Sequence, residues 1–114
     1  MEKDWKTANR ELAQAIGVYR QAAGETAEAF TGLATAATKD GPIDPKTKEL
    51  IALAIGIALR CQGCVGFHTQ AAIRLGATRE EIIETINLAV YMGGGPSYVY
   101  GAEALKAYDQ LSGG

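Results

Sequence analysis

The segment IALAIGIALR, at residues 51–60, decides which fold class this chain can adopt. Its large and small residues alternate with period two, which is typical of a strand. Two other observations favour a helix: Asp44 followed by Pro45 is a helix-start signal, and alanine is favoured in helices and depleted in strands. A single strand also cannot satisfy its own backbone, and no second segment of the sequence reads as its partner. We therefore predict a buried helix over residues 45–59 and an all-α fold.

Helix-start and helix-stop signals divide the rest of the chain into further helices. Gly76 stands at a C-cap position, and Thr78 and Glu81 have capping-box spacing. The segment GGGP, at residues 93–96, separates the last two helices. No repeat or low-complexity linker is evident, so we expect one domain over residues 1–114. It would contain about six helices: one at the cysteine pair described below, and five over residues 4–23, 25–38, 45–59, about 78–92 and about 97–111.

The predicted helix over residues 45–59 also bears on assembly. It is apolar on nearly all sides, and its Ala52 and Gly56 would let another helix approach closely. An alanine-rich chain of 114 residues has little other surface with which to cover such a helix. We therefore expect a homo-oligomer of three or more subunits.

Composition and charge exclude several kinds of partner. The net charge is −2 and the Lys and Arg residues are scattered, which gives no electrostatic footprint for nucleic acid or an anionic membrane. The longest apolar run, Leu50 to Leu59, is too short to span a bilayer. The charged segment MEKDWKTANR contains no apolar stretch typical of a secretory signal. We therefore expect a cytoplasmic protein, in which a cysteine pair is more often catalytic or metal-binding than a structural disulfide.

Both cysteines and the only histidine lie in the segment RCQGCVGFH, at residues 60–68. On a helix, Cys61, Cys64 and His68 fall within a narrow arc of one face, at about 100° per residue. Cys64 and His68 are one turn apart, so His68 could act as a base toward Cys64 far more easily than toward Cys61. Cys61 is placed to close a disulfide onto Cys64 if the helix begins near it. A helix N-terminus also favours the ionised thiolate.

The spacing alone leaves other interpretations open. A Cys-x-x-Cys pair recurs by chance, buried cysteine behaves as a small hydrophobe, and a lone histidine on a helix is often structural. A structural zinc ion wants four ligands; the segment offers three, so Glu49 or a partner subunit would have to complete the site. The placement on one face favours thiol chemistry instead, and Gly63 and Gly66 would keep side chains clear of an approaching oxidant. We expect no metal and no other cofactor.

The segment KELIALAIGIALRCQGCVGFHTQAAIRLGATREEIIETINLAVYMGGGP resembles the carboxymuconolactone decarboxylase family, in its alkyl hydroperoxidase D-like (AhpD-like) branch. The resemblance extends over about residues 40–110. The family motif of Glu, eleven residues, Cys-x-x-Cys, three residues and His is matched by Glu49, Cys61, Cys64 and His68. The resemblance implies a compact all-α bundle that forms homo-oligomers, often trimers or hexamers, with the thiol site close to subunit contacts.

The resemblance also implies a role for each of these side chains. In the peroxidase members, the second cysteine reduces a hydroperoxide, the first resolves it, and histidine and glutamate form a proton relay. Carried over to this sequence, Cys64 is the nucleophile and Cys61 the resolving thiol. His68 is the base and Glu49 its partner. The implied function is a thiol-dependent peroxidase or disulfide oxidoreductase that an external dithiol resets; the competing class is a non-catalytic oligomeric redox-sensing or binding protein.

Three details of the sequence qualify this implication. The better-studied peroxidase has a second histidine directly before the nucleophile, where this chain has Gly63, which implies a shorter relay. Members that decarboxylate carboxymuconolactone generally lack the cysteine pair, so its presence argues against that activity. Glu49 would lie about 18 Å from Cys61 along one straight helix at about 1.5 Å per residue. The relay therefore requires the chain to turn within RCQGC, so that Glu49 returns alongside the cysteine helix.

Overall fold

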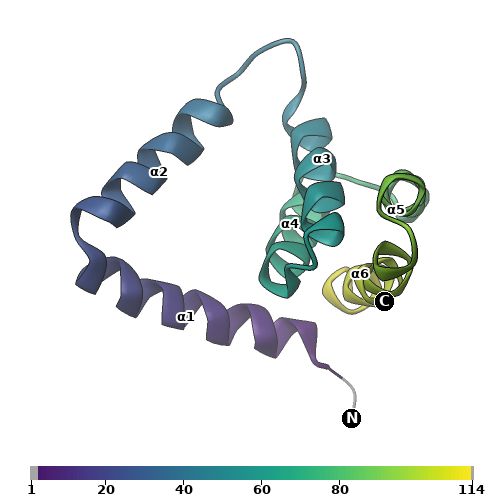
Figure 1. The fold of residues 1–114 in the computed structure, drawn as a ribbon, viewed down its shortest axis with the longest axis horizontal. Coiled ribbons are helices and arrows are strands. Elements are labelled where there is room, and N and C mark those ends of the chain that lie inside the picture. The colour runs from purple at the N-terminus through teal and green to yellow at the C-terminus, as the bar shows by residue number, and fades with distance from the viewer. Residues whose placement is uncertain (1–2, 114) are drawn as a thin grey trace.

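The computed structural model describes residues 3–113, which form six α-helices and no strand (Figure 1). The predicted all-α class and number of helices are confirmed. For the five helices whose ranges were predicted, each end lies within one residue of its observed position, except the start of α6, because Gly94 alone separates α5 from α6. None of the helices in this range is long and apolar enough to cross a membrane. The helices are α1 (Trp5–Ala23), α2 (Glu25–Ala37), α3 (Pro45–Ala58), α4 (Gln62–Arg74), α5 (Arg79–Gly93) and α6 (Gly95–Leu111).

The starts of α3 and α5 follow the local signals of the sequence. Asp44 accepts a hydrogen bond from the Thr47 backbone N–H at 2.8 Å, and Pro45 occupies the first turn of α3, where its missing N–H leaves no bond unmade. Thr78 and Glu81 form the predicted capping box of α5. Each cap satisfies backbone N–H groups that have no partner inside the helix.

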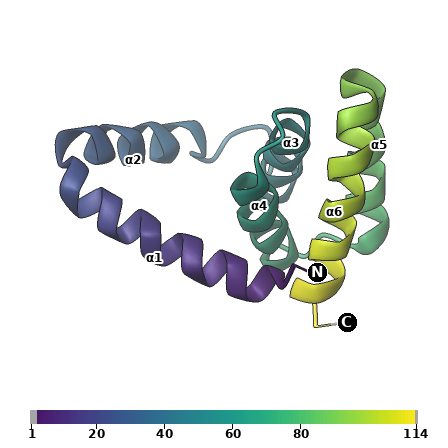
Figure 2. The same ribbon diagram turned by 60° about the horizontal axis from the view of Figure 1, so that its bottom comes forward.

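Helices α3 to α6 pack as two pairs around the core, α3 with α4 and α5 with α6 (Figures 1 and 2). The first turns of α1 lie against α4 and α6. Half of the buried apolar side chains are alanine, so the helices can approach one another closely. The buried apolar residues are Trp5, Leu53, Ile57, Val65, Ala72, Ala77, Ile82, Ala89, Ala104 and Ala107.

The prediction of a buried helix over residues 45–59 is correct for only one face of α3 in this protomer. Leu53, Gly56 and Ile57 are buried, but Ile51 is 44% exposed and Ile55 is 53% exposed. One face of α3 packs on the neighbouring helices, and the other lies in solvent. The sequence pattern could not separate the two faces, because both carry large apolar side chains.

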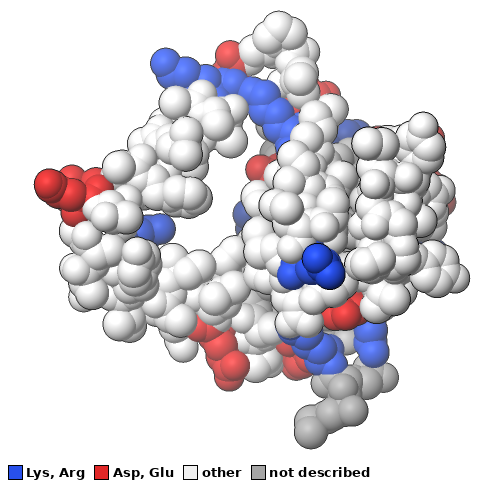
Figure 3. Space-filling model, viewed as in Figure 1, with Lys and Arg blue, Asp and Glu red and all other residues white. Residues whose placement is uncertain are grey.

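The second half of α1 and the whole of α2 project from the core as an arm, residues 16–37 (Figures 1 and 2). α2 contains no buried residue and, among the helices of residues 3–113, packs only against α1. The space-filling view shows an open hollow between the arm and the core (Figure 3). A cavity of about 640 Å³ lies there, between α1, α2 and Phe67 of α4. Large apolar side chains are exposed along the arm: Ile16, Val18, Tyr19, Phe30 and Leu33.

Candidate active site

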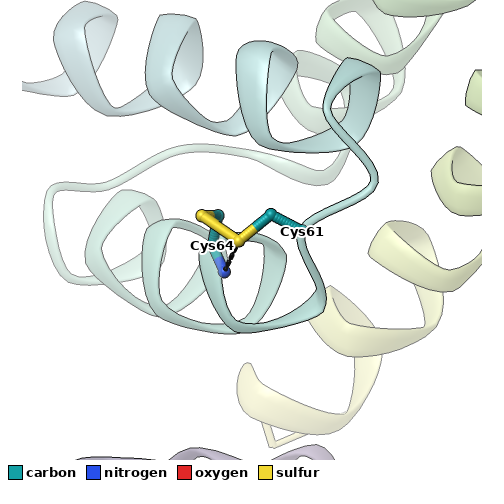
Figure 4. Close-up of a disulfide and its surroundings, with 2 residues drawn as sticks. All are labelled: Cys61 and Cys64. Carbon is teal, nitrogen blue, oxygen red and sulfur yellow. Dashed lines mark hydrogen bonds between the residues drawn. A yellow bond between two sulfur atoms is a disulfide. The ribbon is translucent and has the colours of Figure 1, made fainter. Parts of the chain in front are cut away.

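A tight turn places the cysteine pair at the start of α4. α3 ends at Ala58, and α4 begins at Gln62. Cys61 is the N-cap residue of α4, and Cys64 lies in its first turn. The two form a disulfide with their Cα atoms 5.2 Å apart (Figure 4). The predicted turn within RCQGC is therefore confirmed, and the disulfide expected between the two cysteines is present.

The sulfur of Cys61 occupies the capping position of the helix. Cys61 Sγ accepts a hydrogen bond from the Cys64 backbone N–H at 3.2 Å (Figure 4). In most N-caps the acceptor is the side-chain oxygen of Ser, Thr, Asp or Asn; here a sulfur takes its place. After reduction of the disulfide, the partial positive charge of the helix N-terminus would stabilise a thiolate at this position. The spacing predicted a helix start near the pair, but it did not identify Cys61 as the cap.

Gly56 lets α3 approach the cysteine pair closely. A Cβ atom at Gly56 would lie 2.8 Å from Cys64 Cβ, well inside the contact distance of two carbon atoms. Gly56 is buried, so α3 and α4 cross with almost no space between them at this point. The close approach predicted from Ala52 and Gly56 is confirmed at Gly56, and the helix that approaches is the one that carries the cysteines.

The return of the chain at this turn brings Glu49 of α3 alongside α4. Glu49 Oε1 lies 2.7 Å from His68 Nδ1, a distance that one straight helix could not provide. The Glu49 side chain is 20% exposed and the His68 side chain 36% exposed. The pair is therefore partly screened from water while solvent still reaches the imidazole.

The contact with Glu49 decides which ring nitrogen of neutral His68 carries the proton. An ionised carboxylate only accepts hydrogen bonds, so Nδ1–H must donate to Glu49 Oε1. Nε2 then presents a lone pair, and it has no hydrogen-bond partner within residues 3–113. His68 follows Cys64 by one turn of α4, so the two side chains lie on neighbouring positions of one helix face. The arrangement can hold a proton acceptor close to Cys64.

Gly63 and Gly66 serve packing, and the expectation that they keep an oxidant's path clear is wrong. A Cβ atom at Gly63 would lie 2.6 Å from Leu12 Cδ2, and one at Gly66 would lie 2.2 Å from Asn9 Oδ1. Both positions therefore face α1. Asn9, which is only 7% exposed, donates hydrogen bonds to the Gly66 carbonyl at 3.0 Å and to Gln70 Oε1 at 2.9 Å.

Asn9 thus fixes α1 against the helix that carries the cysteine pair, a role that the sequence analysis missed. The only signal in the sequence is positional. Trp5, Asn9 and Leu12 follow one another at helical spacing, so a polar residue interrupts an apolar face. Such an interruption is a common place for a buried hydrogen bond between helices.

The described residues contain no ready-made metal site. Within residues 3–113, no three side chains of His, Cys, Asp or Glu are grouped so that they could hold a metal ion. In this state both sulfurs are bonded to each other, and the one histidine is bonded to Glu49. The arrangement present is a disulfide beside a carboxylate–imidazole pair.

Comparison with known proteins identifies relatives over almost the whole chain. A carboxymuconolactone decarboxylase family protein of Legionella pneumophila has a crystal structure that matches with a TM-score of 0.92, at 47% sequence identity, over 97% of this chain and 99% of that one. A member of the same family from Thermotoga maritima matches with a TM-score of 0.77, at 29% identity, over 96% of this chain and 90% of that one. An uncharacterised protein of Cupriavidus necator is 40% identical over 98% of this chain and 99% of its own length.

The sequence model of one family covers most of the same region. The model describes the carboxymuconolactone decarboxylase family and matches residues 24–107. This range includes the arm helix α2, the cysteine pair and the Glu49–His68 pair. The chain therefore belongs to the carboxymuconolactone decarboxylase family.

Proposed function

We propose that the chain is a thiol-dependent peroxidase or disulfide oxidoreductase of the AhpD-like branch. The observation that carries the proposal is the closed Cys61–Cys64 disulfide at the start of α4, one turn before a histidine that is bonded to Glu49. Both cysteines are half-buried, so solutes can reach them. A cysteine pair that can open and close a disulfide, beside a proton acceptor, can carry out the two-electron reduction of a peroxide.

In the first step, the reduced protein consumes the hydroperoxide at Cys64. His68 Nε2 takes the proton of the Cys64 thiol, and the thiolate attacks one oxygen of the hydroperoxide. The O–O bond breaks, Cys64 becomes a sulfenic acid, and the departing alkoxide receives the proton from His68. The Glu49 carboxylate holds the imidazole in the tautomer that this transfer needs, and it stabilises the imidazolium that forms briefly.

The second step restores the disulfide and the third removes it. The Cys61 sulfur attacks the sulfur of the Cys64 sulfenic acid, water leaves, and the Cys61–Cys64 bond forms. An external dithiol then attacks the disulfide, and two successive exchanges return both cysteines to the reduced state while the dithiol is oxidised. The Cα atoms of the two residues are 5.2 Å apart, within the range that a disulfide spans.

One relative and one local difference bear on the efficiency of this cycle. The related Thermotoga maritima protein is described with a possible role in the antioxidative response, which agrees in kind with the proposal. A second histidine before the nucleophile would have to replace Gly63. Even a Cβ atom added at Gly63 would lie only 2.6 Å from Leu12 Cδ2. In this chain the relay therefore consists of His68 and Glu49, and turnover is expected to be slower than in a peroxidase with both histidines.

The decisive experiment is peroxide consumption by the pure protein with different dithiol reductants. Thioredoxin-type and lipoyl-type reductants are compared, and Cys64→Ser and Cys61→Ser serve as inactive controls. We expect multiple turnovers with at least one reductant and none in the Cys64→Ser variant. A single stoichiometric oxidation without turnover would contradict the peroxidase and favour a redox-sensing protein that only changes state. A protein that decarboxylates carboxymuconolactone and consumes no peroxide would contradict both the peroxidase and the redox-sensing protein.

The active form is proposed to be a cytoplasmic homo-oligomer, a trimer or a hexamer. The exposed apolar side chains of the arm and the hollow behind it have no partner in a single protomer, and burial of such surface is the main driving force of association. A reducing compartment supplies the dithiol that the cycle requires.

A further inference from the structure

Arg60 occupies an unusual backbone position directly before the cysteine pair. Its φ angle is 58°, and among residues 3–113 it is the only residue other than glycine with a positive φ. The Cys61 N–H donates to the Gly56 carbonyl at 2.9 Å and the Arg60 N–H to the Ile57 carbonyl at 3.1 Å. This pair of bonds is the Schellman ending of a helix, in which the position of Arg60 is normally glycine.

A side chain at such a position carries a conformational cost that glycine avoids, because its Cβ atom crowds the backbone. Strained positions of this kind persist where they serve a function. The other turns of the described chain that need a positive φ use glycine, at Gly24, Gly76, Gly94 and Gly113. The presence of arginine rather than glycine at residue 60 therefore suggests that its side chain has a role.

No contact within the protomer supplies that reason. Arg60 is exposed, and within residues 3–113 its guanidinium makes no hydrogen bond or ion pair. Arg79, by contrast, is bonded to Asp109 at 2.9 Å. Within the protomer, therefore, no side chain of residues 3–113 forms an ion pair with Arg60.

The position of this charge relates it to the disulfide. Arg60 and Cys61 are consecutive residues, so their Cα atoms are about 3.8 Å apart, and the residue that carries the charge is bonded directly to one of the two disulfide cysteines. The neighbouring Leu59 is 71% exposed and adds an apolar surface beside the charge. An anionic molecule that approaches the disulfide on this side is attracted toward Cys61.

We propose that Arg60 is a specificity residue that selects a negatively charged dithiol as the reductant of the disulfide and directs it to Cys61. The inference rests on the disulfide cycle of the proposed function. One thiol of the reductant gives its proton to His68 Nε2 and attacks the Cys61 sulfur as a thiolate. The Cys61–Cys64 bond breaks, and Cys64 leaves as a thiolate that takes this proton from His68. The second thiol of the reductant then attacks the mixed disulfide and releases Cys61, so the reductant loses two electrons and the protein gains them.

The test compares two dithiols that differ only in charge, dihydrolipoate and its neutral amide, dihydrolipoamide. The second-order rate constant for reduction of the Cys61–Cys64 disulfide is measured without peroxide, by quenching and mass spectrometry of alkylated thiols. The preference is the rate constant with dihydrolipoate divided by the rate constant with dihydrolipoamide. At low salt, we expect this ratio to be roughly three-fold higher in the native protein than in Arg60→Gln. Added salt should remove this advantage.

Three further variants separate charge recognition from structure. Arg60→Lys should keep the preference, and Arg60→Gly should lose it while it raises the unfolding temperature, because glycine relieves the backbone cost. Arg74→Gln is the matched control: it removes an exposed arginine from the far end of α4, about 18 Å along the axis, and should leave the preference unchanged. The same ratio of rate constants in native protein and Arg60→Gln would overturn the proposal. A disulfide that neither dithiol reduces would overturn it too, whereas failure of peroxide turnover alone would count only against the peroxidase.

Discussion

Glu49 Oε1 lies 2.7 Å from His68 Nδ1, although the two residues belong to different helices and are 19 positions apart in the sequence. The turn between α3 and α4 makes this contact, and the same turn positions the disulfide. The carboxylate, the imidazole and the two sulfurs are thus products of one local reversal of the chain. Substitutions in α3 or α4 that disturb this turn should therefore change the reactivity of Cys64.

The first prediction concerns the ionisation of Cys64. In the reduced protein, His68→Gln removes the proton acceptor one turn from Cys64, so less thiolate is present at neutral pH. We expect alkylation of Cys64 to slow by roughly ten-fold and that of Cys61 to change little. Glu49→Gln should slow Cys64 alkylation less, because it acts through the histidine. The measurement is the pH dependence of alkylation at each cysteine.

The control for this prediction is the stability of each variant, measured by thermal unfolding. A purely structural His68 predicts a loss of stability or assembly with unchanged reactivity of Cys64 in the protein that remains folded. Identical Cys64 profiles in native protein, His68→Gln and Glu49→Gln would end the proton-relay hypothesis and leave a thiol pair influenced only by its helix.

The second prediction concerns the close approach of α3 and α4. Gly56→Ala places a Cβ atom 2.8 Å from Cys64 Cβ, so the helices must separate, and we expect a loss of about 1–3 kcal/mol in unfolding free energy. The Glu49–His68 contact should loosen with it, and Cys64 alkylation should slow. Gly17→Ala is the matched control: nothing lies within 4 Å of its new Cβ atom, so it should stabilise the helix by up to about 1 kcal/mol. Equal unfolding free energies for the two variants would refute the packing role of Gly56.

Much of the fold was predictable because its signals are local. Asp44–Pro45 and the Thr78–Glu81 box fix the starts of α3 and α5 through bonds between residues three positions apart. The spacing of Cys64 and His68 likewise depends only on helix geometry. Glu49 is different, because its pairing with His68 was predicted only from the resemblance to the family. The two side chains can reach each other only because the chain turns before Cys61.

The remaining features depend on tertiary contacts that no local pattern encodes. The reason for Gly63 and Gly66 is the approach of α1, more than fifty positions away. The buried hydrogen bonds of Asn9 have the same origin. The two faces of α3 are both apolar, and only the packed structure reveals that Ile55 faces solvent. The sequence shows that these residues are present, but it does not show which residues they contact.

The third prediction concerns acid stability. Glu81 accepts a hydrogen bond from the Thr78 backbone N–H at 2.9 Å and from Lys46 at 2.9 Å, and these contacts hold the pKa of its carboxyl below the ordinary value of 4.5. A lowered native pKa stabilises the fold above pH 4.5, and this contribution is lost as the pH falls through the native pKa. We expect the unfolding temperature of Glu81→Gln to change less between pH 6 and pH 3 than that of the native protein.

The control is Glu84→Gln, which removes an exposed glutamate one turn further along α5. It should leave the acid dependence of the unfolding temperature as it is in the native protein. If Glu81→Gln follows the native curve as well, the capping box contributes nothing that depends on the charge of Glu81.

The fourth prediction concerns the arm. Phe30 of α2 is 68% exposed and lines the cavity between the arm and the core, so assembly of several chains would bury it. Phe30→Glu places a charge in that contact, where it cannot be solvated, and should shift the protein toward smaller species. Thr35→Glu is the control: it adds the same charge to the same helix at an exposed position outside the cavity lining, and should leave the assembly intact. Light scattering checks both variants. A native protein that remains a monomer near its chain mass of 12.0 kDa would contradict the assembly outright.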